Sequence, residues 1–421
     1  MVIGLLLHLY QPPWQYASVV SDISQSCYLP LLKLFKNKKG FKVTVNTPLS
    51  LLEWFEKLRI DDSIPQFKQL IELGVVEIVG SGAYHPILTK IPAGEVERQI
   101  ILNELGLGYF YGKTEGFEGE DSMLIKNLGG FFPPELAFNA KIGETLADLG
   151  YFYTVVDESS IDQRPSERLF KLRDTSLNVV VRNRDLSLCL GFKRDSDPKD
   201  FMDGLKFLEE QGEKFVCLAL DGETFGHYNK EGIALLDSLI DECLSLGHKF
   251  ETLTTIVKEY ETDKTGEVRE ASWGAGDVEM AKGNLYPKWY QTKNNLHQSF
   301  VTLEELLSSY FASNTSKYSK VDGAQTLGNL PIWDFNKVSV IEGLTMEQKS
   351  FLKARVLFDK SLNSDKYWWS CADNDYDANV IKRALELFMR SSEKIADFDD
   401  SLTDKVKEIR DEILLKLKES K

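Results

Sequence analysis

The chain of 421 residues lacks the features that mark membrane-spanning proteins and nucleic-acid-binding proteins. It has no apolar run approaching the ~20 residues that a membrane-spanning helix needs. Its 50 Lys and Arg are outnumbered by 65 Asp and Glu, which gives a net charge of −15. Nucleic acids and anionic membrane surfaces attract basic proteins, so this balance disfavours both partners. A neutral small molecule or a neutral polymer fits the composition better.

Cysteine is scarce, and the common short cofactor and catalytic motifs are missing. The five cysteines are widely spaced and form no CxxC pair, which argues against a disulfide framework and a zinc knuckle. The chain contains no P-loop, no GxGxxG after a strand, no GxSxG elbow and no HExxH motif. The sequence therefore predicts no cofactor and no metal, and it leaves the oligomeric state open.

The N-terminal run Val2–Leu7 is apolar, but it is too short for the core of a signal peptide and has no basic segment before it. Unpaired, widely spaced cysteines are typical of a reducing compartment. Both observations predict a cytoplasmic protein.

Residues 1 to about 262 alternate short apolar runs with amphipathic segments such as Leu49–Leu58 and Phe201–Gln211. This alternation predicts parallel strands with right-handed helical crossovers, in a closed or nearly closed barrel. An open, doubly wound sheet is the alternative. The predicted strands are Val2–Leu7, Phe41–Val45, Val75–Val79, Gly129–Phe132, Phe152–Val156, Val179–Arg182 and Lys214–Leu220.

The pattern changes after residue 262. Asp263–Glu270 is polar and reads as a linker, and a Gly-rich loop with Trp273 follows it. Apolar residues then recur every three or four positions, which predicts helices. We therefore expect a barrel over residues 1–262 and a helical region over residues 263–421. The predicted helices of that region are Asn294–Tyr310, Thr345–Ser361, Ala378–Ser392 and Ser401–Leu417.

Carboxylates follow several of the predicted strands, and two of these placements point to a function. Glu135 comes after Phe131–Pro134, and Asp221 and Glu223 come directly after the strand that ends at Leu220. In parallel α/β folds the carboxyl ends of the strands form the rim on which active sites are built. A pair of carboxylates on one rim is the equipment that glycoside hydrolysis requires.

Three of the five histidines, His8, His85 and His227, also follow predicted strands. They could bind a metal together with Asp221, as in a deacetylase-like barrel, or they could hydrogen-bond sugar hydroxyls. Metal sites usually take two ligands from one short motif such as HxxxH, and no such pair occurs here. We therefore favour the second interpretation.

Tryptophans could serve as flat platforms for sugar rings, although core packing is their commoner role. Trp273 in the Gly-rich loop and Trp368 and Trp369 in a polar segment are better candidates than Trp54, which lies in a helical pattern.

Five motifs, in this order along the chain, together resemble glycoside hydrolase family 57. The resemblance implies an incomplete parallel (β/α)7 barrel followed by a mostly helical C-terminal region. The five motifs are His8–Pro12 (HLYQP), Gly80–Leu88 (GSGAYHPIL), Phe131–Glu135 (FFPPE), Asp221–His227 (DGETFGH) and Ser364–Trp368 (SDKYW).

The resemblance implies a retaining enzyme that acts on α-glucans, an α-amylase or a 4-α-glucanotransferase, with an α-galactosidase also possible. It makes Glu135 the nucleophile and Asp221 the acid/base, whereas the residues alone leave Glu223 as a competing acid. The sequence departs from the family's first motif at Tyr10, where the family has a second histidine. The alternatives are a catalytically impaired carbohydrate-binding protein and a metal-dependent polysaccharide deacetylase. The predicted substrate-binding residues are His8, Gln11, Trp14, His85, Glu223, His227, Trp273, Asp365 and Trp368.

Overall fold

The structure is a computed structural model. It describes residues 1–60, 63–112, 129–161, 168–191, 198–314, 320–321, 325–326, 332–371, 376–396 and 399–419.

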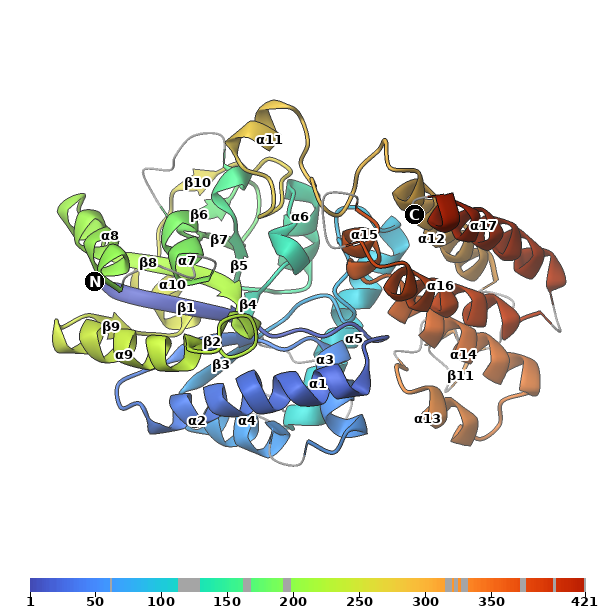
Figure 1. The fold of residues 1–421 in the computed structure, drawn as a ribbon, viewed down its shortest axis with the longest axis horizontal. Helices are drawn as coiled ribbons and strands as arrows, with labels where there is room; N and C mark the ends of the chain where they lie inside the picture. Colours follow the sequence, from blue (N-terminus) through green and yellow to red (C-terminus); the bar gives the residue numbers. More distant parts are fainter. Residues whose placement is uncertain are drawn as a thin grey trace.

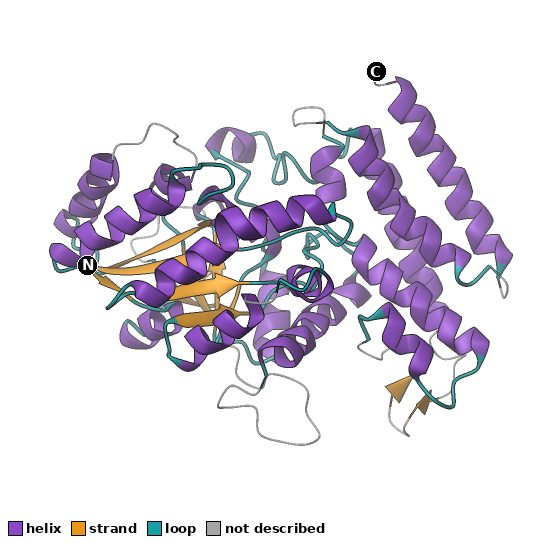
Figure 2. Ribbon diagram, turned by 60° about the horizontal axis from the view of Figure 1, so that its bottom comes forward, coloured by secondary structure: helices purple, strands orange, loops and turns teal. Residues whose placement is uncertain are grey.

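Seven parallel strands form the inner layer, and helices surround them (Figures 1 and 2). The central strand is β1 (Val2–His8), which pairs along its whole length with β8 (Phe215–Asp221) and at its carboxyl end with β2 (Val43–Asn46). Strand β3 (Val76–Val79) continues the sheet beyond β2. All of β1 is buried, as expected for a strand covered on both faces.

A second sheet continues the same circle. Strand β4 (Gly130–Phe131) pairs with β5 (Tyr153–Val156), which pairs with β7 (Asn178–Val181). A parallel bridge between Gly80 and Phe131 links the two sheets. Among the described residues no ladder joins β7 to β8, where Asn183 N–H donates to the carbonyl oxygen of Cys217 (2.7 Å). The barrel is therefore incomplete, with its opening between these two strands.

Each of the seven predicted strands is present, with ends shifted by a few residues at most. The barrel prediction is confirmed, and the open doubly wound sheet is not observed. In residues 1–270, the described part of the chain also contains three short strands that were not predicted: β6 (Leu169–Leu172), β9 (Lys249–Phe250) and β10 (Thr265–Gly266). Strand β10 lies inside the predicted linker, Asp263–Glu270, and pairs with β6. The predicted linker therefore contributes a strand to the second sheet.

Crossover helices and short covering helices pack around the strands (Figure 1). They are α1 (Ala17–Ile23), α2 (Leu29–Asn37), α3 (Leu49–Lys57), α4 (Ser63–Glu72), α5 (Ala93–Tyr111), α6 (Ala140–Asp148), α7 (Arg184–Gly191), α8 (Pro198–Glu210), α9 (Gly232–Ser245), α10 (Leu253–Glu259) and α11 (Asp277–Ala281).

The C-terminal part is mostly helical, as predicted, and it includes one small hairpin of β11 (Lys320–Val321) and β12 (Gln325–Thr326). Its helices are α12 (Asn295–Asn314), α13 (Phe335–Val340), α14 (Met346–Ser361), α15 (Asp365–Trp369), α16 (Ala378–Glu393) and α17 (Asp400–Glu419).

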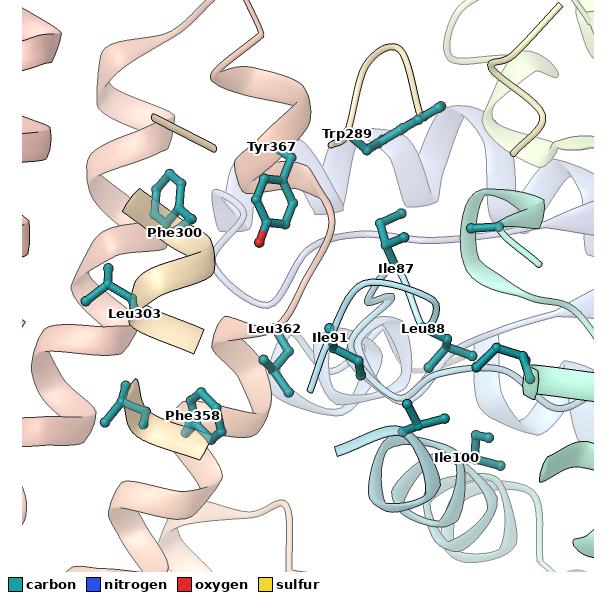
Figure 3. Packing of buried hydrophobic residues seen from close by; sticks show 14 of the residues in the cluster. Ile87, Leu88, Ile91, Ile100, Trp289, Phe300, Leu303, Phe358, Leu362 and Tyr367 are labelled. Atoms are coloured by element: carbon teal, nitrogen blue, oxygen red, sulfur yellow. The ribbon is translucent and has the colours of Figure 1, made fainter. Parts of the chain in front are cut away.

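The helical part and the barrel share one hydrophobic cluster (Figure 3). Ile87, Leu88 and Ile91 of the barrel lie on one side, and Phe358 and Leu362 lie on the other. Ion pairs reinforce this packing, since Arg98 of α5 contacts the buried carboxylate of Asp359 in α14 (2.7 Å). The boundary at residue 262 remains a prediction, but the residues on either side of it fold against each other.

All five cysteines are buried free thiols. None of the described helices is both long enough and apolar enough to cross a membrane.

Candidate active site

Four acidic side chains gather at the carboxyl ends of the strands, where parallel strands present their polar residues. Glu135 follows β4, Asp221 ends β8, Glu223 lies in the next turn, and Asp365 begins α15. We call these four residues the carboxylate cluster. The charges of Asp221 and Asp365 raise the pKa of Glu135, the charge of Asp365 raises that of Asp221, and the charge of Asp221 raises that of Glu223. The four carboxyl groups therefore interact electrostatically.

Glu135 is held by hydrogen bonds from two side chains. The indole N–H of Trp273 donates to its Oε2 (2.8 Å), and the hydroxyl of Ser364 donates to its Oε1 (3.4 Å). Burial and the charges of Asp221 and Asp365 raise the pKa of Glu135 well above its usual range, and the two donors oppose this shift. The donors favour the ionised carboxylate, the form that a nucleophile requires.

The backbone at this position is unusual. Glu135 lies in a turn of 3-10 helix, Pro134–Leu136, with φ 59° and ψ 19°. This left-handed conformation is rare for residues other than glycine. His85, which lies beside Glu135, is also left-handed with φ 58°. Both side chains are therefore presented to the rim by conformations that the surrounding packing must maintain.

Asp221 shows the raised pKa that a proton donor needs near neutral pH. Burial is the main cause of a pKa of about 6; Arg182 lowers it and Asp365 raises it. Arg182 is itself fixed, because it donates to Asp157 Oδ2 (2.5 Å) and to the carbonyl oxygen of Ala219 (2.8 Å).

Glu223 is more enclosed than Asp221. Its Oε1 accepts hydrogen bonds from the Tyr28 hydroxyl (2.5 Å) and from the backbone N–H of Tyr10 (2.9 Å). Burial and the charge of Asp221 raise its pKa to about 8. Gln11 donates to the same Tyr28 hydroxyl (3.2 Å), so it lies one residue behind Glu223. Glu223 is thus a buried neighbour of Asp221, bound into the wall of the barrel.

His8 and His85 are both buried, and burial disfavours the charged form of each ring. Burial lowers the pKa of His8 to about 4, and its Nδ1 lies 2.7 Å from Asn46 Oδ1. Burial, together with His8, lowers the pKa of His85 well below its usual range. The two rings stack at 4.7 Å, and Nδ1 of His85 lies 2.9 Å from the Ser364 hydroxyl. His85 therefore supports the serine that donates to Glu135.

Tyr10 stands where the resembled family has a histidine. Its ring stacks on His85 at 4.1 Å, and its hydroxyl donates to Asp365 Oδ2 at 2.5 Å. Burial raises the pKa of Asp365 to about 6, while the Tyr10 hydrogen bond and Lys366 lower it.

The predicted tryptophans separate. Trp273 contacts Glu135 directly and lies under the Arg182 guanidinium, 5.2 Å from the ring centre. Trp14 is buried in a small cluster with Leu357 and Leu387. Trp368 packs against Trp289 at 5.4 Å, with the Lys288 ammonium over its ring. The structure thus places Trp273 beside Glu135 and Trp14 in a packed cluster, and sugar binding by the partly buried Trp368 stays a prediction.

His227 lies in the turn after Glu223, half-buried, with its ring 4.9 Å from that of Tyr228. Burial is the main cause of its lowered pKa. His227 is close to Glu223 in sequence, but its ring contacts that of Tyr228.

Among the described residues, four that hold the cluster were not among the predicted site residues: Ser364, Arg182, Tyr28 and Tyr10. Ser364 and Arg182 could have been found, since Ser364 begins the fifth motif and Arg182 ends a predicted strand. Tyr28 gave no signal, because it lies in a helical stretch (Ser24–Tyr28) far from any motif.

Within the described residues, no group of three His, Cys, Asp or Glu side chains is arranged to hold a metal ion.

The fold and the site place the chain among incomplete (β/α)7-barrel proteins with a carboxylate-lined rim. The chain belongs to Glycosyl hydrolase family 57, whose sequence profile matches residues 7–269. An α-amylase of Pyrococcus furiosus is 29% identical over 152 residues, which are 36% of this chain and 21% of that protein. A 4-α-glucanotransferase of Thermococcus litoralis is 26% identical over 152 residues, with the same coverage. The matched segment is thus about one fifth of either relative's length.

Solved structures share the fold over nearly the whole chain. A family 57 branching enzyme of Pyrococcus horikoshii has a TM-score of 0.68 at 17% identity, over 97% of this chain and 94% of its own. An exo-type maltose-forming amylase of Pyrococcus sp. ST04 has a TM-score of 0.70 at 12% identity, over 97% and 81%. At these identities the likeness establishes the fold alone.

Proposed function

We propose that this protein is a retaining glycoside hydrolase or transglycosylase that acts on α-glucans through a covalent glycosyl-enzyme. Glu135 is the nucleophile, and Asp221 is the acid/base. The observation that carries the proposal is the environment of Glu135, a buried carboxylate that accepts hydrogen bonds from Trp273 and Ser364 beside a second acid of raised pKa.

The reaction has two steps. In the first, the Glu135 carboxylate attacks the anomeric carbon, the glycosidic bond breaks, and Asp221 gives its proton to the departing oxygen. In the second, the Asp221 carboxylate takes a proton from water or from a sugar hydroxyl, which attacks the anomeric carbon and releases Glu135. This geometry requires the two carboxyl groups to lie about 5–5.5 Å apart in the substrate complex.

The substrate class follows from the relatives and from the chemistry of the rim. Relatives of this chain are named α-amylase and 4-α-glucanotransferase. Water and a sugar hydroxyl compete for the same intermediate, so one site supports either outcome. Neutral donors and acceptors around the rim suit uncharged sugar hydroxyls, and Trp273 offers an aromatic surface beside the nucleophile.

Incubation with maltooligosaccharides of defined length tests the proposal. Hydrolysis gives shorter products alone, and transfer gives longer products as well. A folded protein that changes no α-linked substrate would contradict the proposal. Binding without turnover would then favour a catalytically impaired carbohydrate-binding protein, the alternative that Tyr10 keeps open.

Metal analysis addresses the remaining alternative, a metal-dependent deacetylase. If the protein bound one zinc ion per chain and lost it when His8 or Asp221 was substituted, the deacetylase alternative would replace the glycosidase proposal.

The free state of all five thiols supports a cytoplasmic location, which we propose as well.

A further inference from the structure

Tyr10 connects three parts of the site that the chain builds from distant segments. Its backbone N–H donates to Glu223 Oε1 (2.9 Å), which follows β8. Its hydroxyl donates to Asp365 Oδ2 (2.5 Å), which begins α15 in the helical part. Its ring lies on His85 (4.1 Å), which follows β3.

The position of Tyr10 is itself firmly fixed. It lies two residues beyond β1, the central strand, and the preceding residue Leu9 donates its N–H to the carbonyl oxygen of Asn46 (2.9 Å). The rings of His85, His8 and Tyr10 form a triangle of stacked rings, with centroids 4.7 Å apart for His8 and His85, 4.1 Å for Tyr10 and His85, and 5.8 Å for His8 and Tyr10. A tyrosine anchored at its backbone and in contact along its ring can place its hydroxyl with little loss of side-chain freedom.

We propose that Tyr10 is a positioning residue of this site, which holds the Asp365 carboxylate in one orientation and keeps His85 against the Ser364–Glu135 pair. The inference rests on the proposed function, because it assigns Tyr10 a part in arranging the same site. Tyr10 thereby holds Asp365 of the helical part in a fixed position relative to the acids at the strand ends.

The chemistry of the phenol suits this role. Burial and the charge of Asp365 raise the pKa of Tyr10 well above its usual range, so it stays a neutral donor at any working pH. A histidine at this position could become a cation, which would lower the pKa of Asp221 and weaken it as a proton donor. Tyr10 donates to Asp365 without adding a charge to the carboxylate cluster.

Tyr10→Phe is the direct test, because it removes the hydroxyl and keeps the ring on His85. We expect kcat/KM on maltooligosaccharides to fall about 10- to 100-fold, as for loss of a hydrogen bond to a charged acceptor. The matched control is Tyr111→Phe, which removes a buried hydroxyl bonded to Thr47 (2.8 Å) and away from the cluster. The control should stay within about twofold of the parent.

A purely structural role would not change the pH profile, whereas positioning of Asp365 does. The Tyr10 hydrogen bond lowers the pKa of Asp365. Without it, Asp365 takes up its proton at a higher pH, and its charge then no longer raises the pKa of Asp221, so the pH profile of kcat/KM should shift in Tyr10→Phe and not in the control. The other titratable groups around Asp365 and Tyr10 are Glu135, Asp221, Glu223, His8, His85, Tyr228 and Lys366.

A double-mutant cycle in urea unfolding tests the contact without any turnover. Tyr10→Phe and Asp365→Ala should together destabilise less than the sum of the single changes, with a coupling of about tenfold in the unfolding constant. Strictly additive changes would overturn the inference, and so would an unchanged pH profile in an active Tyr10→Phe enzyme. If the parent protein turns over no α-glucan, the proposed function fails and the cycle still decides the role of Tyr10.

Discussion

The carboxylates of the rim and the carboxylate of the helical part are held in different ways. Asp221 is the last residue of β8, and its backbone pairs with His8 in a ladder that runs the length of β1. Asp365 begins a helix of five residues, α15, which belongs to no sheet. Side-chain and single backbone contacts hold it instead, among them the N–H of Ser364 donating to the carbonyl oxygen of His85 (3.0 Å).

A buried ion pair is one of these contacts. Lys366 Nζ lies 2.7 Å from Glu304 Oε1, and both side chains are almost wholly buried, at 0% and 2% exposed. A sheet ladder fixes an acid through many equivalent bonds, whereas α15 depends on a few specific side chains. Substituting a neighbour should therefore change the position of a strand-end acid little, whereas substituting the acid itself should change the reaction. The position of Asp365 should depend on the side chains that contact α15.

The largest expected effect is at the strand-end nucleophile. Glu135→Ala should lower kcat by several orders of magnitude, because no covalent intermediate can form. Added azide should restore turnover by attacking the anomeric carbon in place of the carboxylate. Glu104→Gln is the control, since Glu104 is a buried carboxyl bonded to Tyr151 (2.7 Å) away from the cluster. Near-normal activity of Glu135→Ala would refute its role as nucleophile.

Asp221→Asn should have a smaller effect that depends on the leaving group. Loss of the proton donor should cost about 10²- to 10⁴-fold on maltooligosaccharides, which leave as basic alkoxides. The nitrophenolate of a nitrophenyl glycoside leaves without protonation, so Asp221→Asn should form the glycosyl-enzyme from such a substrate at a nearly unaffected rate. If the leaving group makes no difference for Asp221→Asn but does for Glu223→Gln, then Glu223 is the acid.

Lys366→Met should reveal how much α15 depends on its buried pair. Leaving Glu304 buried without its partner should destabilise the fold by about 3–5 kcal/mol, measured by urea unfolding. The double substitution Lys366→Met with Glu304→Leu should regain most of that loss, because both charges are gone. A single variant as stable as the parent would show that α15 is held mainly by apolar packing.

The smallest effect concerns the pH limb set by Asp221. The protonated carboxyl is the reactive form, so kcat/KM should fall as the pH rises through a pKa of about 6. Arg182 lowers this pKa, so Arg182→Met should move the descending limb to higher pH. Arg182→Lys keeps the charge and serves as the control. A limb that moves to lower pH in Arg182→Met would contradict the assignment of this limb to Asp221.

Much of the rim could be predicted because a strand has a strict pattern. Apolar runs marked all seven barrel strands, and the polar residues after them led to Glu135, Asp221, His8 and His85. Asp365 and Trp273 lie outside any strand, and only the resemblance and the Gly-rich loop indicated them. Strand β6 was missed because its apolar run is only four positions long and is interrupted by Lys171.

Contacts between segments far apart in the chain could not be read from local patterns. Tyr28 reaches Glu223 across 195 positions, and Tyr10 reaches Asp365 across 355. Trp14 looked like a sugar platform beside the first motif, yet it packs against helices of the C-terminal part. Periodicity reports which face of an element is buried, but it does not report which other element covers that face.

The left-handed backbone of Glu135 and His85 has a consequence for any attempt to improve this protein. Each such residue costs folding about 1–2 kcal/mol, which a glycine would not. At Glu135 the change also removes a buried carboxyl group, so a screen that rewards heat resistance alone should favour Glu135→Gly and discard the proposed nucleophile. Screens for durable variants would have to score catalysis together with melting temperature.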